Sequence, residues 1–180
     1  KISSCDDQGT VYIGEDNVFR IVPTKHIDSV IKILNKLNNE IEGIVKTKIC
    51  EDENINLKLK KNDELILQHQ KISPISYPHE WCALMLKDAA LFQLDLSINL
   101  YKEGLYLKDA HPWNILFEKG SPVFVDFTSV VNDQALLDED FLDSNASMNI
   151  STNDQISRCI QEIYQRMFKP YFFNPLLSYV

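Results

Sequence analysis

The stretch from Tyr106 to Phe127 limits most strongly what this chain can fold into. It reads Y-L-K-D-A-H-P-W-N-I-L-F and, after a short interval, V-F-V-D-F. An amide, Asn114, follows the acid Asp109 by five positions, and a second acid, Asp126, follows the amide by twelve. Oxygen-bearing side chains of this kind are hard ligands that suit a divalent cation, and an acid can orient a hydroxyl. The alternative is a polar turn between two apolar strands.

Composition indicates a globular protein and narrows the classes of partner. The chain has 180 residues, of which 44% are hydrophobic and 24% charged, enough for one domain or two small lobes. Its net charge of −8 argues against nucleic acid or an anionic membrane surface as the main partner, because both reward a basic surface. A nucleotide stays possible, since it needs only a local cation.

The cysteines and the apolar runs indicate a cytoplasmic protein. The four cysteines are scattered without a C-x-x-C pair, so we expect reduced thiols and neither a zinc site nor a disulfide framework. Charged residues interrupt the most apolar stretch, from Trp81 to Tyr101, so we expect no membrane span. The chain begins with lysine rather than methionine and has no signal-peptide pattern, and we expect a fragment of a longer protein.

The first part of the chain predicts a small antiparallel sheet with one helix. Residues 10–13 and 18–22 flank a turn and predict a hairpin. Apolar residues then recur at helical spacing from Ile27 to Ile44, with Thr24 as the expected N-cap. Two further strands are expected at residues 55–59 and 65–70.

The second part predicts a mainly helical lobe that carries the polar stretch. Prolines mark a linker between two lobes. We expect the first lobe at residues 1–73 and the second at residues 74–180. A helix from residue 80 to 103 is apolar on nearly every side and is expected to be buried. Strands at 114–118 and 122–127 follow the polar loop, and residues 132–154 predict a loop or short helix. Residues 155–168 predict a helix, and prolines 170 and 175 are expected to break up the aromatic tail that follows.

On these residues the chain resembles the protein-kinase-like fold, and its loop is similar to that of the aminoglycoside-phosphotransferase branch. That loop reads H-x-D-x-H-P-x-N before a strand, and this chain matches it at Asp109, His111, Pro112 and Asn114. Asp126 stands where these families keep a metal-binding aspartate. The resemblance implies an α+β, reduced two-lobe fold: a small antiparallel sheet plus helix, then a mainly helical lobe with a catalytic-loop hairpin.

A longer pattern in the chain supports a more specific resemblance. It reads G-L-Y-L-K-D-A-H-P-W-N-I-L-F-x-x-G-x-P-V-F-V-D-F-x-S. It resembles the N-terminal region of large bacterial nodulation-protein-like SAM-dependent methyltransferases. This implies a downstream methyltransferase domain in the same chain, which would bind S-adenosylmethionine outside these residues. No glycine-rich loop for that cofactor is present in the sequence.

The resemblance implies a role for each polar residue of the stretch. Asp109 would orient the attacking hydroxyl and accept its proton, and Asn114 and Asp126 would bind Mg²⁺. The alternatives are a capping aspartate and a pair of side chains that stabilise the loop. His111 is expected to brace the loop, and Trp113 to be a packing group.

The nucleotide-binding elements of the family are less well matched. Kinases carry a third-strand lysine paired with a glutamate of the next helix. Here Arg20 stands at the lysine position, and Glu40, with Glu42 second, is the expected partner, although a solvated surface charge is the alternative. No G-x-G-x-x-G loop is present, Leu107 replaces the family's histidine, and D-F-T replaces D-F-G.

Three functions follow from this reading. The first is an ATP- and Mg²⁺-dependent phosphotransferase module with a small-molecule or glycan acceptor, attached to a methyltransferase. The second is a catalytically inactive pseudokinase that positions or regulates the methyltransferase domain. The third is a structural interaction domain. Whether the chain is an enzyme stays open at this point.

Overall fold

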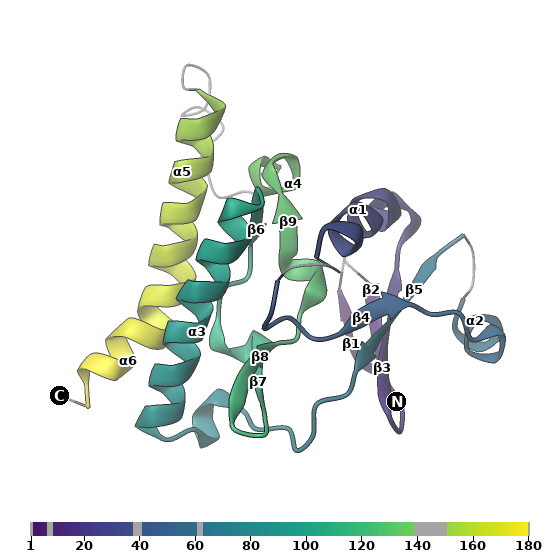
Figure 1. The fold of residues 1–180 in the computed structure, drawn as a ribbon, viewed down its shortest axis with the longest axis horizontal. Coiled ribbons are helices and arrows are strands. Elements are labelled where there is room, and N and C mark those ends of the chain that lie inside the picture. Colours follow the sequence, from purple (N-terminus) through teal and green to yellow (C-terminus); the bar gives the residue numbers. More distant parts are fainter. Residues whose placement is uncertain (1, 7–8, 38–40, 61–62, 139–150, 180) are drawn as a thin grey trace. The chain divides into compact units, whose positions relative to one another are not determined.

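The computed structural model describes residues 2–6, 9–37, 41–60, 63–138 and 151–179. Helices and antiparallel sheets alternate along the chain (Figure 1), which confirms the expected mixture of a small antiparallel sheet with helices. The chain divides into two compact units. The N-terminal unit comprises Lys1–Glu40 with Ile44–Ser73, and the C-terminal unit comprises Ile41–Gly43 with Pro74–Val180.

The N-terminal unit is built on a five-stranded antiparallel sheet in the order β1-β2-β3-β5-β4. Its strands are β1 (Ile2–Asp6), β2 (Gly9–Ile13), β3 (Asn17–Val22), β4 (Thr47–Ile49) and β5 (Leu65–Gln70). The hairpin of β2 and β3 and the strand at 65–70 confirm the sequence-based expectation. Gly9 lies at the tight entry to β2, where a Cβ atom would lie 1.8 Å from the carbonyl oxygen of Ile21.

Two helices flank this sheet, and one of them was expected as a strand. Helix α1 (Ile27–Leu37) buries Val30, Ile33, Leu34 and Leu37, as its spacing predicts. Helix α2 (Glu53–Leu59) replaces the strand expected at 55–59, because Asp52 caps it by accepting hydrogen bonds from the backbone N–H groups of Asn54 and Ile55. Figure 1 shows the two helices on either side of the sheet.

The predicted ends of the first helix were also wrong. Thr24 begins a 3₁₀ turn (Thr24–His26), and its hydroxyl donates to the carbonyl of Asp63 at 3.1 Å instead of capping α1. The described part of α1 ends at Leu37 rather than Ile44. Glu42 and Gly43 form a turn in which Gly43 has a φ of +95°, a backbone conformation incompatible with a continuing helix.

The apolar face of the sheet explains how α2 is held. Residues on alternate positions of β3 and β5 share one face, and Phe19, Ile21 and Ile66 pack there with Cys50. Ile55 and Leu59, one helical turn apart on α2, cover this cluster together with Tyr12. Ile55 and Leu59 are four residues apart, and in so short a segment this spacing also fits the alternation of a β-strand.

The C-terminal unit begins with the long helix α3 (Ala83–Lys102). One side of this helix is buried and includes Leu86, Ala89, Leu96 and Leu100. The opposite side leaves large apolar residues exposed, so the expectation of burial all round was wrong. These residues are Leu84, Leu91, Leu94, Ile98 and Tyr101.

Two short strand pairs follow α3 and fix the polar loop between them. Strand β6 (Leu105–Leu107) pairs with β9 (Val130–Asn132), and β7 (Ile115–Glu118) pairs with β8 (Ser121–Phe124). Lys119 and Gly120 join β7 to β8 with φ values of 50° and 86°, as a two-residue hairpin turn requires. The hairpin confirms the expected pair of strands, whereas the pairing of β6 with β9 was not anticipated.

The last elements are helical. Helix α4 (Asp133–Leu137) falls in the segment expected as a loop or short helix, of which residues 139–150 lie outside the described residues. Helix α5 (Thr152–Ile163) continues into a π-helical segment (Tyr164–Phe173) and α6 (Asn174–Leu177). The expectation that Pro170 breaks up the aromatic tail was wrong, because it lies inside the π-helical segment, whose wider turn accommodates a residue that lacks an N–H.

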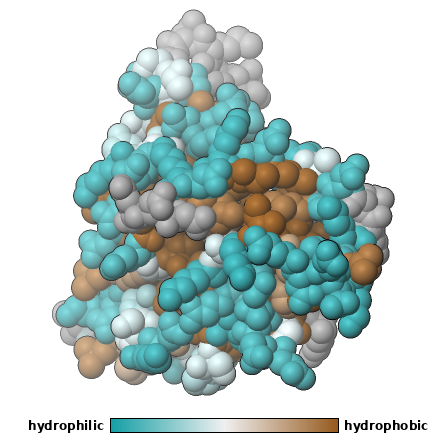
Figure 2. Space-filling view, turned by 45° about the vertical axis from the view of Figure 1, so that its right-hand side comes forward, coloured by the Kyte–Doolittle hydropathy of each residue, from teal (hydrophilic) through white to brown (hydrophobic). Residues whose placement is uncertain are grey.

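Apolar residues also reach the surface outside α3. On the face drawn in Figure 2, hydrophobic residues form a band between hydrophilic ones. In the described part of the chain no helix combines the length and the apolar character needed to cross a membrane.

Candidate functional site

Asp109 lies at the start of the polar loop, directly after β6. The preceding residue, Lys108, donates its backbone N–H to the carbonyl of Ser129 at 3.0 Å, which ties the loop to the start of β9. The carbonyl oxygen of Asp109 accepts a hydrogen bond from Nδ2 of Asn114 at 3.0 Å. Because the Asn114 amide nitrogen is engaged, its Oδ1 oxygen is the atom that could bind a cation.

Asp126 lies just beyond the hairpin, and backbone contacts bring it back to the loop. The N–H of Val125 donates to the carbonyl of Asn114 at 2.8 Å. The hydroxyl of Thr128 donates to Oδ1 of Asp126 at 2.9 Å, and that of Ser129 donates to Oδ2 at 2.5 Å. These bonds fix the orientation of the carboxylate, as is usual for a carboxylate that binds metal.

The hydroxyl of Ser129 links the two predicted acids. Its Oγ lies 2.5 Å from Oδ2 of Asp126 and 3.3 Å from Oδ2 of Asp109. A hydroxyl has one proton, and the shorter contact shows that Asp126 receives it. Two carboxylates on either side of one hydroxyl repel each other, and a cation beside them would relieve this repulsion.

The structure therefore joins Asp109 and Asp126 through Ser129, a residue to which sequence reasoning gave no role. Asn114 is tied to the same loop by its hydrogen bonds with Asp109 and Val125. Ser129 is fully buried. Its position three residues after Asp126 carries no local signal, because its contact with Asp109 depends on the pairing of β6 with β9.

The donor set fits Mg²⁺ in chemical type. The carboxylate of Asp126 and the amide oxygen of Asn114, the two predicted ligands, are hard oxygen donors. Within the ranges that the structure describes, no cluster of three or more histidine, cysteine, aspartate or glutamate side chains is placed to hold a metal ion.

His111 and Trp113 lie in the loop with different environments. The buried Nδ1 of His111 has no hydrogen-bond partner within the described ranges, and the ring meets Tyr171 edge-on with centroids 6.4 Å apart. Trp113 is half exposed and lies against Tyr77 and His79 at 6.1 Å and 5.8 Å between ring centroids. Trp113 therefore packs at the surface rather than in the core.

The structure describes only some of the residues proposed to bind the nucleotide. Arg20 lies in the third strand, buried, opposite Val11 of β2 and Leu67 of β5. Glu40 lies outside the described residues. Glu42, the second choice, is exposed in the turn after α1 and not on a helix, because the described helix ends at Leu37.

Tyr106, in β6 beside the loop, makes the free energy of unfolding depend on pH. Burial, followed by the hydrogen bond to Asp133 and the charge of that residue, raises the pKa of the Tyr106 phenol well above its ordinary value. Tyrosine in an unfolded chain ionises near pH 10, at about its reference pKa. The free energy of unfolding therefore has its full Tyr106 contribution below about pH 10 and loses it as pH rises further.

We expect Tyr106→Phe to remove this contribution. Urea denaturation of the wild type and the variant at pH 8 and pH 11 measures it. The wild type should lose more stability between the two pH values than the variant does. Equal losses would show that Tyr106 does not titrate differently in the folded chain.

The cysteines for which the structure gives a side-chain environment agree with the expectation of free thiols. Cys50, Cys82 and Cys159 are unbridged. Burial raises the pKa of the Cys159 thiol, which makes it a poor nucleophile.

Part of the chain is similar to a known protein. A stretch of 65 residues, 36% of this chain, is 43% identical to the nodulation protein NoeA of Rhizobium meliloti (strain 1021). The match spans 14% of the length of that protein. No protein-family model matches the chain. The similarity supports a nodulation-protein-like relationship.

Proposed function

We propose that this chain is a kinase-like phosphotransferase module that uses ATP and Mg²⁺ in the cytoplasm to phosphorylate a hydroxyl of a small molecule or glycan. The observation that carries the proposal is the link from Asp109 to Asp126 through the buried hydroxyl of Ser129, with the side chain of Asn114 bonded to the backbone of Asp109. Phosphoryl transfer needs a positioned hydroxyl and charge neutralisation more than covalent chemistry. This set of side chains is suited to both tasks.

The order of elements supports the same proposal. Strand β3, which carries Arg20, precedes helix α1, and the long helix α3 precedes the loop and its hairpin. These elements follow one another in the order of the kinase-like fold that we propose. Arg20 and Glu40 are the proposed nucleotide-anchoring residues, with the arginine replacing a lysine.

Each residue of the loop has one proposed task. Oδ2 of Asp109 contacts Ser129, so its Oδ1 is the atom that would accept the proton of the attacking hydroxyl. Asn114 and Asp126 would hold Mg²⁺, which supplies the positive charge that neutralises the phosphates. Ser129 and Thr128 would keep the Asp126 carboxylate in position.

The parent protein is proposed to be a transferase with a downstream methyltransferase domain that binds S-adenosylmethionine. This rests on the resemblance of the loop region to such proteins and on the similarity to NoeA over part of the chain. The acceptor and that downstream domain are the proposed partners, and neither nucleic acid nor a membrane is among them.

A pseudokinase is the second candidate, and one observation favours it. Both carboxylate oxygens of Asp126 accept hydrogen bonds from neighbouring hydroxyls, an arrangement that also stabilises a turn without a metal. Such a module would position or regulate the methyltransferase domain without transferring phosphate.

Replacement of Asp109 separates these functions. We expect the protein with ATP, Mg²⁺ and a panel of hydroxyl-bearing small molecules and glycans to form ADP, and Asp109→Asn to slow this by about 100-fold or more, the usual contribution of a general base. Asp95→Asn, an exposed acid of α3, is the control. ADP formation by Asp109→Asn at the wild-type rate would contradict the assigned role, and binding of ATP without any transfer would favour the pseudokinase.

A further inference from the structure

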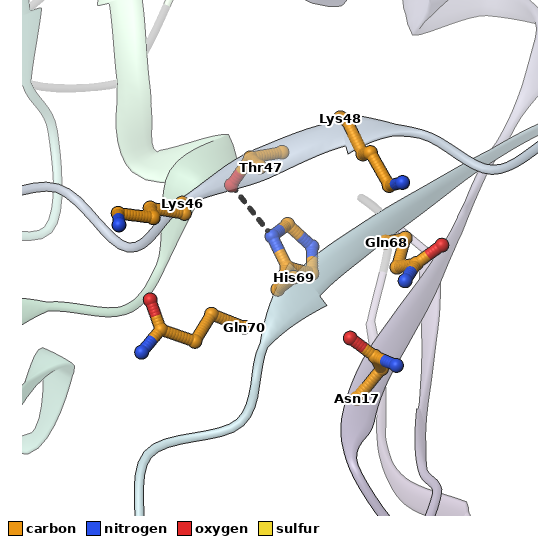
Figure 3. Close-up of a pocket in the computed structure, with 7 residues that line it drawn as sticks. All are labelled: Asn17, Lys46, Thr47, Lys48, Gln68, His69 and Gln70. Atoms are coloured by element: carbon orange, nitrogen blue, oxygen red, sulfur yellow. Dashed lines mark hydrogen bonds between the residues drawn. The ribbon is translucent and has the colours of Figure 1, made fainter.

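A polar pocket of about 500 Å³ lies in the N-terminal unit, formed entirely by its own residues (Figure 3). This volume falls in the range of roughly 300–1,000 Å³ that small-molecule sites occupy. The lining residues come from β3, β5 and β4 with the residue before it: Asn17, Lys46, Thr47, Lys48, Gln68, His69 and Gln70. None of them belongs to the proposed Asp109–Asn114–Asp126 site.

The strand register explains why polar side chains gather here. Asn17 is opposite Gln70, and Lys48 is opposite Gln68, so these four residues share one face of the sheet. This is the face that carries Phe19, Ile21 and Ile66 further along, where α2 covers it. The apolar end of the face is therefore closed by α2, and the polar end forms the pocket.

The charge of the lining is opposite to that of the chain. The chain carries a net charge of −8, yet the lining contains two lysines and no aspartate or glutamate. Neither Lys46 nor Lys48 forms a salt bridge with any residue in the described part of the chain. Two ammonium groups without carboxylate partners beside the same pocket attract an anion.

Thr47 and His69 also border the pocket, from register positions that alternate with those of Lys48 and Gln68. The hydroxyl of Thr47 donates its proton to the carbonyl of Val45 at 2.8 Å. The contact of 2.8 Å between Thr47 Oγ1 and His69 Nδ1 must therefore have Nδ1–H of the imidazole as its donor. Figure 3 shows this bond, and it fixes both the tautomer and the orientation of a side chain that is only 5% exposed.

We propose that this pocket binds a small polyol that carries a phosphate group, of the sugar-phosphate class. The ammonium group of Lys48, which lies on the same side as Gln68 and Asn17 in Figure 3, would hold the phosphate, and the side-chain amides of Asn17 and Gln68 would exchange hydrogen bonds with hydroxyls. Lys46 points the other way and would add only to the positive potential of the pocket. Amides both donate and accept, which matches a hydroxyl. The lining offers no aromatic residue besides His69 on which a base could stack, and this favours a sugar over a nucleoside.

Calorimetric titration of the protein without Mg²⁺ tests the proposal, with glucose 6-phosphate as the probe. Glucose, inorganic phosphate and AMP are compared in parallel. We expect glucose 6-phosphate to bind at least about tenfold more tightly than each of them, because only it offers the anion and the polyol without a base. Binding of phosphate alone or of AMP with equal or higher affinity would overturn the proposal, as would no binding of the sugar phosphate.

Two matched variants locate the site. Lys46→Gln with Lys48→Gln should weaken glucose 6-phosphate binding by about tenfold or more, since the first removes a positive charge from the pocket and the second a charged hydrogen-bond donor. Lys25→Gln with Lys32→Gln removes the same charge from exposed positions outside the pocket and should leave affinity nearly unchanged.

Amide NMR shifts of the wild type provide a readout that does not depend on a variant. Addition of glucose 6-phosphate should move the signals of residues 46–48 and 68–70. Shifts confined to other residues, or equal losses of affinity in the two double variants, would contradict the assignment. Because these experiments contain neither Mg²⁺ nor ATP, a negative result leaves the proposed phosphotransfer site unaffected.

Discussion

Asp126→Asn is expected to abolish stabilisation of the chain by ATP with Mg²⁺. A ligand at one hundred times its dissociation constant stabilises the folded state by about 2.7 kcal/mol. For a chain of this size that corresponds to a rise in Tm of about 5–10 °C. The asparagine keeps the shape of the side chain but removes the charge that would hold the cation, so the variant should show little or no rise.

The control for this experiment is Asp88→Asn, because Asp88 is exposed on α3 and outside the loop. It should show the same rise in Tm as the wild type. Thermal unfolding with and without ATP and Mg²⁺ measures both variants. An undiminished rise in Asp126→Asn would show that the nucleotide, if bound, is held without the proposed metal ligand.

The largest loss of stability is expected from Phe124→Ala. Phe124 is fully buried in β8, where it faces the equally buried Ile115 across the hairpin, and its N–H donates to the carbonyl of Gly43 at 2.8 Å. Truncation of a buried phenylalanine costs about 3–5 kcal/mol. The same hairpin connects Asn114 to Asp126, so the variant should also bind Mg²⁺ more weakly.

Val123→Ala is the matched control, since Val123 is the neighbouring residue of β8 and only half-buried. Its cost should be about 1 kcal/mol, a common value for a single substitution. Urea denaturation followed by tryptophan fluorescence measures both. A smaller loss for Phe124→Ala than for Val123→Ala would mean that the hairpin core does not hold the C-terminal unit together.

Patterns within a short segment predicted the elements that depend on local sequence. The hairpin of β2 and β3 and that of β7 and β8 have turn residues between apolar runs, and α1 and α3 have long helical spacing. The sequence I-N-L-K-L of α2 fits both a strand and a helix. The cap offered by Asp52 was the signal that could have separated the two.

Features that depend on distant contacts could not be predicted in the same way. Strands β6 and β9 have three residues each and form only because they meet each other. Ser129 lies beside Asp109 as a result of that pairing, and no local pattern indicates this contact. The apolar residues of α3 likewise do not reveal which side is covered, because Leu86 and Leu84 differ only in what packs against them.

The most direct test of the proposed metal site is a titration of the protein with Mn²⁺, a paramagnetic substitute for Mg²⁺, followed by broadening of assigned amide NMR signals. We predict that the signals of Asp109, Asn114 and Asp126 broaden first and that excess Mg²⁺ restores them. Initial broadening at other acidic positions, such as residues 51–53 or 133–138, with the loop unaffected, would contradict the existence of the site.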